Sequence, residues 1–161
     1  MTETTTVLSF LAEQYGSELK AFQDSLDSVP DEAFAVATLS HAPAWHALHI
    51  CDWLRLVVMN DRTPNHHHLG WEDKSWAQNL KTFPAPLSDE AGKAAVLARL
   101  DEVSAQVLAC LRGMTDDDLK GMTFSPSAPT GERPRLLALG LHLRHVAYHR
   151  GQVQLGKKVS G

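Results

Sequence analysis

The sequence has few of the residues that mark several common classes of protein. Only two of its 161 residues are cysteines, Cys51 and Cys110, and two cysteines cannot form the disulfide framework of a small secreted domain. No apolar run approaches the roughly 20 residues that a membrane-spanning helix needs. The first residues, Met1 to Thr6, include an acidic side chain and no basic one, unlike a signal peptide. We therefore expect a soluble, cytoplasmic protein with reduced thiols.

Clustered positive charge is also missing. Lys and Arg number 15 against 19 Asp and Glu, which gives a formal net charge of −4 at pH 7. The largest basic cluster is the pair Lys157 and Lys158. Proteins that bind nucleic acids gather Lys and Arg on one surface, so the sequence predicts a small-molecule substrate and neither a nucleic-acid nor a membrane partner.

The chain is otherwise ordinary in composition except for its histidines. Hydrophobic residues make up 43% and charged residues 21%, close to the average of globular proteins. The length predicts a single domain over residues 1–161. Nine histidines are present, and their positions carry the functional argument.

Four segments show the three-and-four spacing of apolar residues that is typical of amphipathic helices. Ser88 could cap the third and Gly156 could end the fourth. No alternating strand pattern stands out, and the connection over residues 61–87 is unusually long. These features predict an all-α four-helix bundle with a long crossover between the second and third helices. The expected helices run from Thr4 to Ser28, from Pro43 to Asn60, from Asp89 to Arg112 and from Pro134 to Leu155.

The expected fourth helix carries a histidine pair at the spacing that suits metal chelation. His145 and His149 lie one turn apart on the same face, and two such imidazoles can bind one ion, although pairs of this kind also occur without metal. His142 lies beside them and is expected to be a neighbour rather than a ligand.

A third ligand would have to come from another helix, because catalytic sites of this type use three protein ligands and leave a position open. The second helix offers His46 and His49. The helical wheel places His46 slightly closer to the apolar face, so periodicity leaves both candidates open.

The two histidine segments resemble those of the DinB/YfiT-like superfamily of metal-binding four-helix bundles. The residues that carry the resemblance are the run His49-Ile50-Cys51-Asp52 and the histidine pair His145 and His149 followed by Arg150-Gly151-Gln152. The resemblance implies a divalent ion, most often zinc or nickel, held by His49, His145 and His149, with His46 as the alternative to His49. It also implies transfer of a low-molecular-weight thiol such as bacillithiol, mycothiol or glutathione, since several relatives act as transferases or isomerases of this kind.

Other polar residues could support such a site or have only structural roles. Asp52 could hold an imidazole N–H or be a surface acid, and Gln152 could orient solvent or substrate or pack between helices. His46 and His142 could line the pocket. Cys51 is expected to be a buried small residue.

The crossover and the segment before the second helix contain the remaining aromatic residues of interest. The run His66-His67-His68 could be a solvated loop or could line the mouth of the site. Trp71 and Trp76 are expected to anchor the loop on the bundle rather than to stack on substrate. His41 is expected to precede the second helix.

The sequence leaves the reaction open between thiol transfer, hydrolysis of a small substrate and a non-enzymatic metal-binding, stress-related role. No Glu or Asp general base stands beside the histidines, and the H-E-x-x-H element of metalloproteases is absent. Thiol transfer therefore leads by resemblance alone. Bundles of this size often associate through exposed helix faces, so a homodimer is a further expectation.

Overall fold

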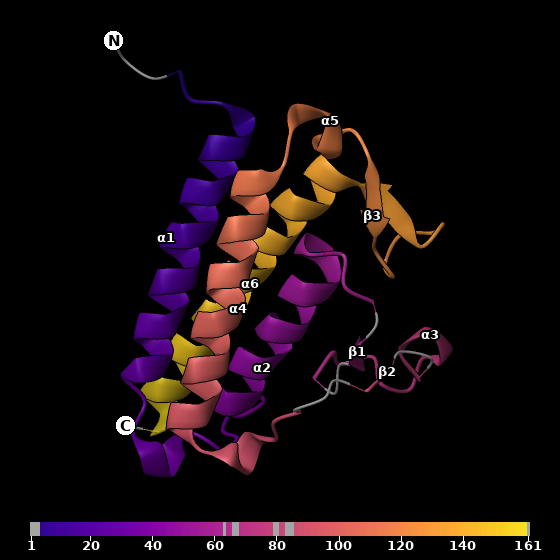
Figure 1. Ribbon diagram of the computed structural model, residues 1–161. Coiled ribbons are helices and arrows are strands. Elements are labelled where there is room, and N and C mark those ends of the chain that lie inside the picture. Colours follow the sequence, from indigo (N-terminus) through magenta and orange to yellow (C-terminus); the bar gives the residue numbers. More distant parts are fainter. Residues whose placement is uncertain (1–3, 63, 66–67, 79–80, 83–85, 161) are drawn as a thin grey trace.

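Four long helices form the bundle that the sequence predicts. The structure is a computed structural model that describes residues 4–62, 64–65, 68–78, 81–82 and 86–160 (Figure 1). Helices α1 and α2 each pack against both α4 and α6 (Figure 1). The predicted all-α fold class is confirmed. The four helices are α1 (Val7–Asp27), α2 (Pro43–Trp53), α4 (Lys93–Gly113) and α6 (Arg135–Ser160).

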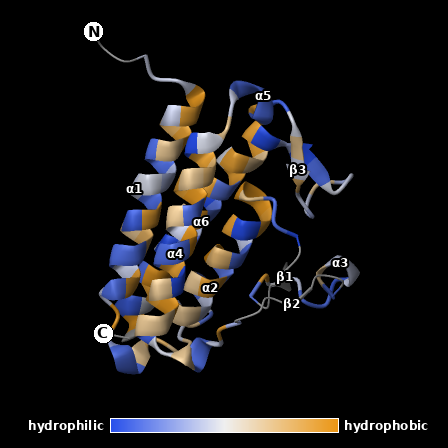
Figure 2. Ribbon diagram, in the orientation of Figure 1, coloured by the Kyte–Doolittle hydropathy of each residue, from blue (hydrophilic) through white to orange (hydrophobic). Residues whose placement is uncertain are grey.

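Helix α1 illustrates how local signals set the limits of an element. Thr6 and Ser9 form a reciprocal capping box, which satisfies backbone N–H groups that no helical carbonyl reaches. Tyr15, Phe22 and Leu26 are fully buried at intervals of seven and four residues, so one face of the helix supplies the core. Figure 2 shows the resulting mixture of hydrophobic and hydrophilic residues along each helix.

The second predicted helix changes its winding partway. Helix α2 ends at Trp53 and continues as a π-helical turn, η2 (Leu54–Val58), instead of running as α-helix to Asn60. Single π-turns are often found at functional sites. Here the turn directly follows α2, the helix that contains His46, His49 and Asp52.

The crossover between α2 and α4 contains short elements that the sequence analysis did not predict. Strands β1 (Pro64–Asn65) and β2 (Lys81–Thr82) pair in parallel, and the short helix α3 (Ser75–Gln78) lies between them in sequence. A second small sheet precedes α6, with β3 (Met122–Phe124) antiparallel to β4 (Glu132–Pro134), after the short helix α5 (Asp116–Leu119). Strands of two or three residues are too short to show an alternating pattern.

Two further helix ends differ from the prediction by more than three residues. Residues Asp89–Ala91 form a 3-10 turn, η3, the Ser88 side chain makes no capping bond, and α4 begins only after Gly92. Gly92 has φ of +104°, a conformation that breaks a helix and favours glycine. At the other end, α6 continues through Gly156 to Ser160. A Cβ at Gly156 would lie 3.1 Å from Thr38 Oγ1, so this glycine permits a close approach and does not stop the helix.

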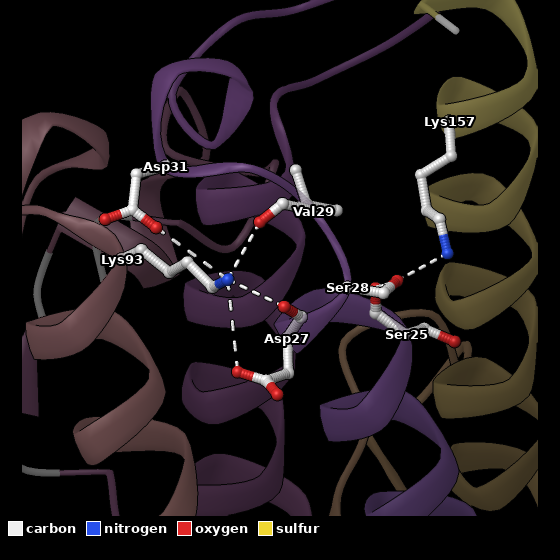
Figure 3. A network of polar contacts seen from close by, with 7 residues as sticks. All are labelled: Ser25, Asp27, Ser28, Val29, Asp31, Lys93 and Lys157. Carbon is white, nitrogen blue, oxygen red and sulfur yellow. Dashed lines mark hydrogen bonds and ion pairs between the residues drawn. The ribbon is translucent and has the colours of Figure 1, made fainter.

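Polar contacts tie three helices together at one end of the bundle (Figure 3). Lys93, at the start of α4, donates to the backbone carbonyls of Asp27 at 2.6 Å and Val29 at 2.8 Å. Lys157 of α6 donates to Ser28 Oγ in the same region. The cation of Lys93 thereby satisfies a carbonyl in the last turn of α1 and another just beyond its end.

Within the described part of the chain, no helix is both long enough and apolar enough to cross a membrane. The main core consists of buried aliphatic and aromatic residues from all four helices. A smaller cluster of Leu56, Leu69 and Ala77 lies beneath the crossover, with Trp76 packed against it.

Candidate metal site

Three histidines from two helices converge on one point between α2 and α6. The Nε2 atom of His145 lies 3.1 Å from Nε2 of His49 and 3.0 Å from Nε2 of His149. One ring nitrogen from each of the three lies within 4.8 Å of the others. The one-turn spacing of His145 and His149 on α6 thus meets a single histidine of α2.

The separations fit the coordination of a divalent ion. With metal–nitrogen bonds of about 2.05 Å, two ligand atoms are about 3.3 Å apart in a tetrahedral site and about 2.9 Å apart in adjacent octahedral positions. The observed 3.0 and 3.1 Å lie between these values. Unprotonated nitrogens at this distance repel each other through their lone pairs, and a cation between them removes that repulsion.

The other ring nitrogen of each histidine is held by an outer partner. Nδ1 of His49 lies 2.6 Å from the backbone oxygen of His68, which accepts its proton. Nδ1 of His149 lies 2.8 Å from Nδ1 of His46, and Nδ1 of His145 lies 3.3 Å from Nδ1 of His142. Such partners fix the orientation and tautomer of metal-binding imidazoles.

Asp52 supports this arrangement through the backbone of the crossover. Its Oδ2 accepts the backbone N–H of His68 at 3.0 Å. The backbone carbonyl of His68 in turn accepts the Nδ1–H of His49. The sequence predicts that Asp52 either holds an imidazole N–H or is a surface acid. The structure instead places it one step further out, on the segment that holds the imidazole.

The His68 side chain is not simply solvated. Its Nε2 lies 3.0 Å from Asp89 Oδ1, and its side chain is 13% exposed. This contact joins the crossover to η3. His66 and His67, the other members of the predicted run, lie outside the described residues.

Burial keeps the candidate ligands neutral. Desolvation, followed by the nearby imidazole of His145, lowers the pKa of His49 to about 3. Burial lowers the pKa of His145 to about 4, and it also lowers the pKa of His149. Metal binding requires unprotonated imidazoles, and these shifts leave almost no proton competing for the site at neutral pH.

Tryptophans that the sequence analysis did not single out flank the site. The Trp45 ring stacks on His49 with centroids 4.4 Å apart and on His41 with centroids 3.5 Å apart. Trp53 donates its indole N–H to the carbonyl of Leu69 at 3.1 Å. Both tryptophans lie four residues from His49, a helical spacing that could have pointed to them.

A cavity of about 240 Å³ adjoins the histidines. Its lining includes His49, His142 and His145 together with Trp53, Trp71, Leu69 and the serines Ser125 and Ser127. Trp71 thus lines the cavity, and its ring also packs near that of Trp76, with centroids 6.1 Å apart. Trp76 does act as an anchor, because it packs on Phe124 at 5.2 Å and on the small cluster beneath the crossover.

A second cavity, of about 380 Å³, lies beyond His46. Gln152 and His46 line it together with residues that follow α1. The structure therefore places Gln152 in a different cavity from the one that His49 and His145 line. Arg150 of the same motif pairs with Glu18 and so joins α6 to α1.

The two cysteines take no part in the site. Cys51 is buried, as predicted, and burial raises the pKa of its thiol. Cys110 is half-buried on α4.

The comparison with solved structures shows the same fold in two bacterial proteins. A conserved protein from Enterococcus faecalis superposes with a TM-score of 0.68 and 16% sequence identity, covering 97% of this chain and 98% of that one. YfiT from Bacillus subtilis, described as a probable metal-dependent hydrolase with an unusual four-helix bundle topology, gives a TM-score of 0.64 and 16% identity, with coverage of 98% and 91%.

Sequence comparison adds the family. No curated protein is significantly similar to the chain. The sequence pattern that defines the DinB superfamily, however, matches residues 14–153, which include every candidate ligand. The chain belongs to the DinB superfamily.

Proposed function

We propose that the protein is a metal-dependent enzyme that binds one divalent ion through His49, His145 and His149 and acts on a small molecule. The observation that carries the proposal is the convergence of three Nε2 atoms at 3.0–3.1 Å beside a cavity. Neutral imidazoles suit zinc and nickel, and we propose one of these as the ion. The cavity volume of about 240 Å³ suits a small substrate.

Transfer of a low-molecular-weight thiol to a small electrophile is the reaction that we favour. A bound divalent cation lowers the pKa of a coordinated thiol or water. Among the described residues that line the cavity, none is Asp or Glu, so no carboxylate is placed to take a proton. A thiol starts from a pKa of about 8.5 and water from about 15.7, so a thiol needs far less help.

The residues of the cavity suit this reaction in other ways. Trp53, Trp71 and Leu69 supply apolar surface to the cavity, and Ser125 and Ser127 supply hydroxyl groups. The two serines can donate hydrogen bonds to a polar group of the thiol or the electrophile.

Hydrolysis of a small substrate is the second candidate, favoured by the description of the Bacillus subtilis protein as a probable metal-dependent hydrolase. A third is a site that only joins α2 to α6 without catalysis. The candidates predict different behaviour on loss of the ion. A structural site would lose helix content on chelation, whereas an enzyme would keep its fold and lose turnover.

The test uses protein loaded with zinc or nickel and, separately, the chelated protein. Each is mixed with bacillithiol, mycothiol or glutathione and 1-chloro-2,4-dinitrobenzene, and thiol consumption is followed. Without thiol, p-nitrophenyl acetate reports hydrolysis. We expect thiol-dependent turnover in the loaded protein and its loss in His145→Ala, with the helix content unchanged. Turnover of the ester alone would favour hydrolysis, and no turnover in either assay would favour the non-catalytic role.

We also propose that the chain forms a homodimer through α6. Leu137, Tyr148, Leu155 and Val159 are between 47% and 62% exposed, and their spacing places them within about 40° on one face of the helix. A stripe of this kind can pack against its own copy. Light scattering should give twice 17.7 kDa, and Tyr148→Asp should shift it toward the monomer mass. A monomeric wild type would contradict the dimer without affecting the metal site.

A further inference from the structure

We propose that His46 is a positioning residue for His149, and that it fixes which nitrogen of His149 faces the ion. The proposal rests on the metal site described above. His46 accepts the Nδ1–H of His149 through its own Nδ1, and Ser40 accepts the proton on the other nitrogen of His46. The chain from Ser40 through His46 to His149 thereby leaves Nε2 of His149 unprotonated.

The contact between the two histidines is short and well buried. Their Nδ1 atoms lie 2.8 Å apart, within the usual range of a hydrogen bond. His46 is 3% exposed and His149 7% exposed, so water has little access to either ring. A hydrogen bond in such surroundings is costly to lose, because the group left behind cannot be solvated.

The proton positions follow from the requirement that His149 bind through Nε2. A neutral imidazole carries one proton, so the proton of His149 must be on Nδ1. Nδ1 of His46 then has to accept, which places the proton of His46 on its Nε2. Ser40 Oγ lies 3.2 Å from that atom and can accept the proton. In the hydrogen-bonded series from Ser40 through His46 to Nδ1 of His149, every ring nitrogen then has a partner of the correct kind.

The same contacts explain why His46 is not itself a ligand. Both of its nitrogens are engaged, one with His149 and one with Ser40. The first contacts the side of the His149 ring that faces away from the other two Nε2 atoms. His46 therefore lies next to a candidate ligand without facing the ion.

The contact between His142 and His145 is the weaker counterpart. The Nδ1 atoms are 3.3 Å apart, and within the described residues Nε2 of His142 is buried without a hydrogen-bond partner. No described residue plays the part of Ser40 in this second pair. Of the two outer histidines, His46 is therefore the one that has both a short contact with its candidate ligand and a hydrogen-bond partner for its other nitrogen.

The experiment compares three substitutions of His46 by their zinc affinity, measured by competition with a chelating dye. Asn places its amide oxygen near the position of Nδ1, Gln places its amide group near the position of Nε2, and Leu offers neither. We expect His46→Leu and His46→Gln to lose roughly 10- to 100-fold in affinity and His46→Asn to recover most of it. A merely structural role would favour Gln, which is closer to histidine in size.

A second measurement reads the tautomers directly. In long-range ¹⁵N–¹H spectra of the zinc-bound wild type, His149 should carry its proton on Nδ1 and His46 on Nε2. Melting temperatures of the variants establish that each is folded before its affinity is interpreted. Ser40→Ala should weaken zinc binding less than His46→Leu does.

The outcomes separate the two proposals. If the wild type binds neither zinc nor nickel, the metal site and the role of His46 both fall. If the wild type binds zinc and His46→Leu binds it equally well, or if Gln restores affinity and Asn does not, only the role of His46 is overturned.

Discussion

At the scale of single residues, the site is a cluster of five imidazoles with two different tasks. His49, His145 and His149 turn Nε2 toward one another, whereas His46 and His142 contact the outer nitrogens of two of them. Trp45 covers one face of His49. An ion in this position would lie close to an indole, which provides an optical signal for binding.

Substitution of Trp45 should therefore change the fluorescence response to nickel more than substitution of a distant tryptophan. Open-shell ions quench nearby indoles, and Trp45 stacks on His49 at 4.4 Å, whereas Trp76 packs against Phe124. We expect Trp45→Phe to remove a large part of the nickel-induced quenching and Trp76→Phe to remove little. Equal quenching in the two variants would place the ion elsewhere.

At the scale of elements, the crossover takes part in the site through its backbone. Among its described residues, three hydrogen bonds hold it next to the site: the N–H of His68 on Asp52, the carbonyl of Leu69 on Trp53, and the side chain of His68 on Asp89. The carbonyl of His68, which lies between the N–H of His68 and the carbonyl of Leu69 along the backbone, accepts the Nδ1–H of His49. The position of a loop residue thus controls the orientation of a helix residue.

Loss of the hydrogen bond between the His68 N–H and Asp52 should weaken metal binding without unfolding the bundle. Asp52→Ala removes the acceptor of the His68 N–H, so we expect zinc affinity to fall roughly tenfold, the lower end of the range for outer partners of metal ligands. Asp52→Asn keeps a carbonyl oxygen and should retain most of the affinity. Dye competition measures both, and an unchanged affinity in Asp52→Ala would show that the loop does not orient His49.

How far the sequence predicts each element depends on how local its signals are. The pair His145 and His149 follows from helical spacing alone, and the amphipathic patterns locate all four long helices. The choice between His46 and His49 does not follow, because the two lie about 60° apart on α2 and both are buried against α6. Only the positions of the partner rings show that one faces the other ligands and the other faces Ser40.

The sequence pattern does not predict features that depend on contacts between residues far apart in the chain. Gly156 reads as a helix stop but lies inside α6, where Thr38 passes close to it. Trp71 reads as a loop anchor, but it also lines the cavity, together with Ser125 and Ser127 from the connection between β3 and β4. In each case the deciding neighbour is more than 50 residues away in the chain.

At the scale of the whole molecule, the core does not depend on the ion. Buried aliphatic and aromatic residues of all four helices form one continuous cluster, and the contact of Glu18 with Arg150 adds a polar link between α1 and α6. We therefore expect the chelated protein to stay folded, with the ion raising its stability by mass action.

Acid should destabilise the chelated protein. The pKa values of His46, His49 and His145 are lowered to about 4, 3 and 4, mainly by burial, whereas in the unfolded chain they are near 6.5. Between about pH 6.5 and pH 4 the unfolded chain binds more protons, so stability present above pH 6.5 is lost as the pH falls.

We expect the free energy of unfolding to fall by at least about 1 kcal/mol from pH 7.5 to pH 5, which lowers the melting temperature by roughly 2–4 °C. His145→Gln, which removes one of these groups, should show a smaller dependence. A melting temperature that rises on acidification would contradict the assigned shifts.

Anomalous diffraction from crystals of the zinc-loaded protein shows whether a single ion is held by the three histidines. We expect one strong zinc peak per chain, about 2.0–2.1 Å from Nε2 of His49, His145 and His149, with His46 outside bonding distance and its Nδ1 turned toward His149. A peak bonded to His46 in place of His49, a peak on the crossover alone, or no peak in fully loaded crystals would contradict it.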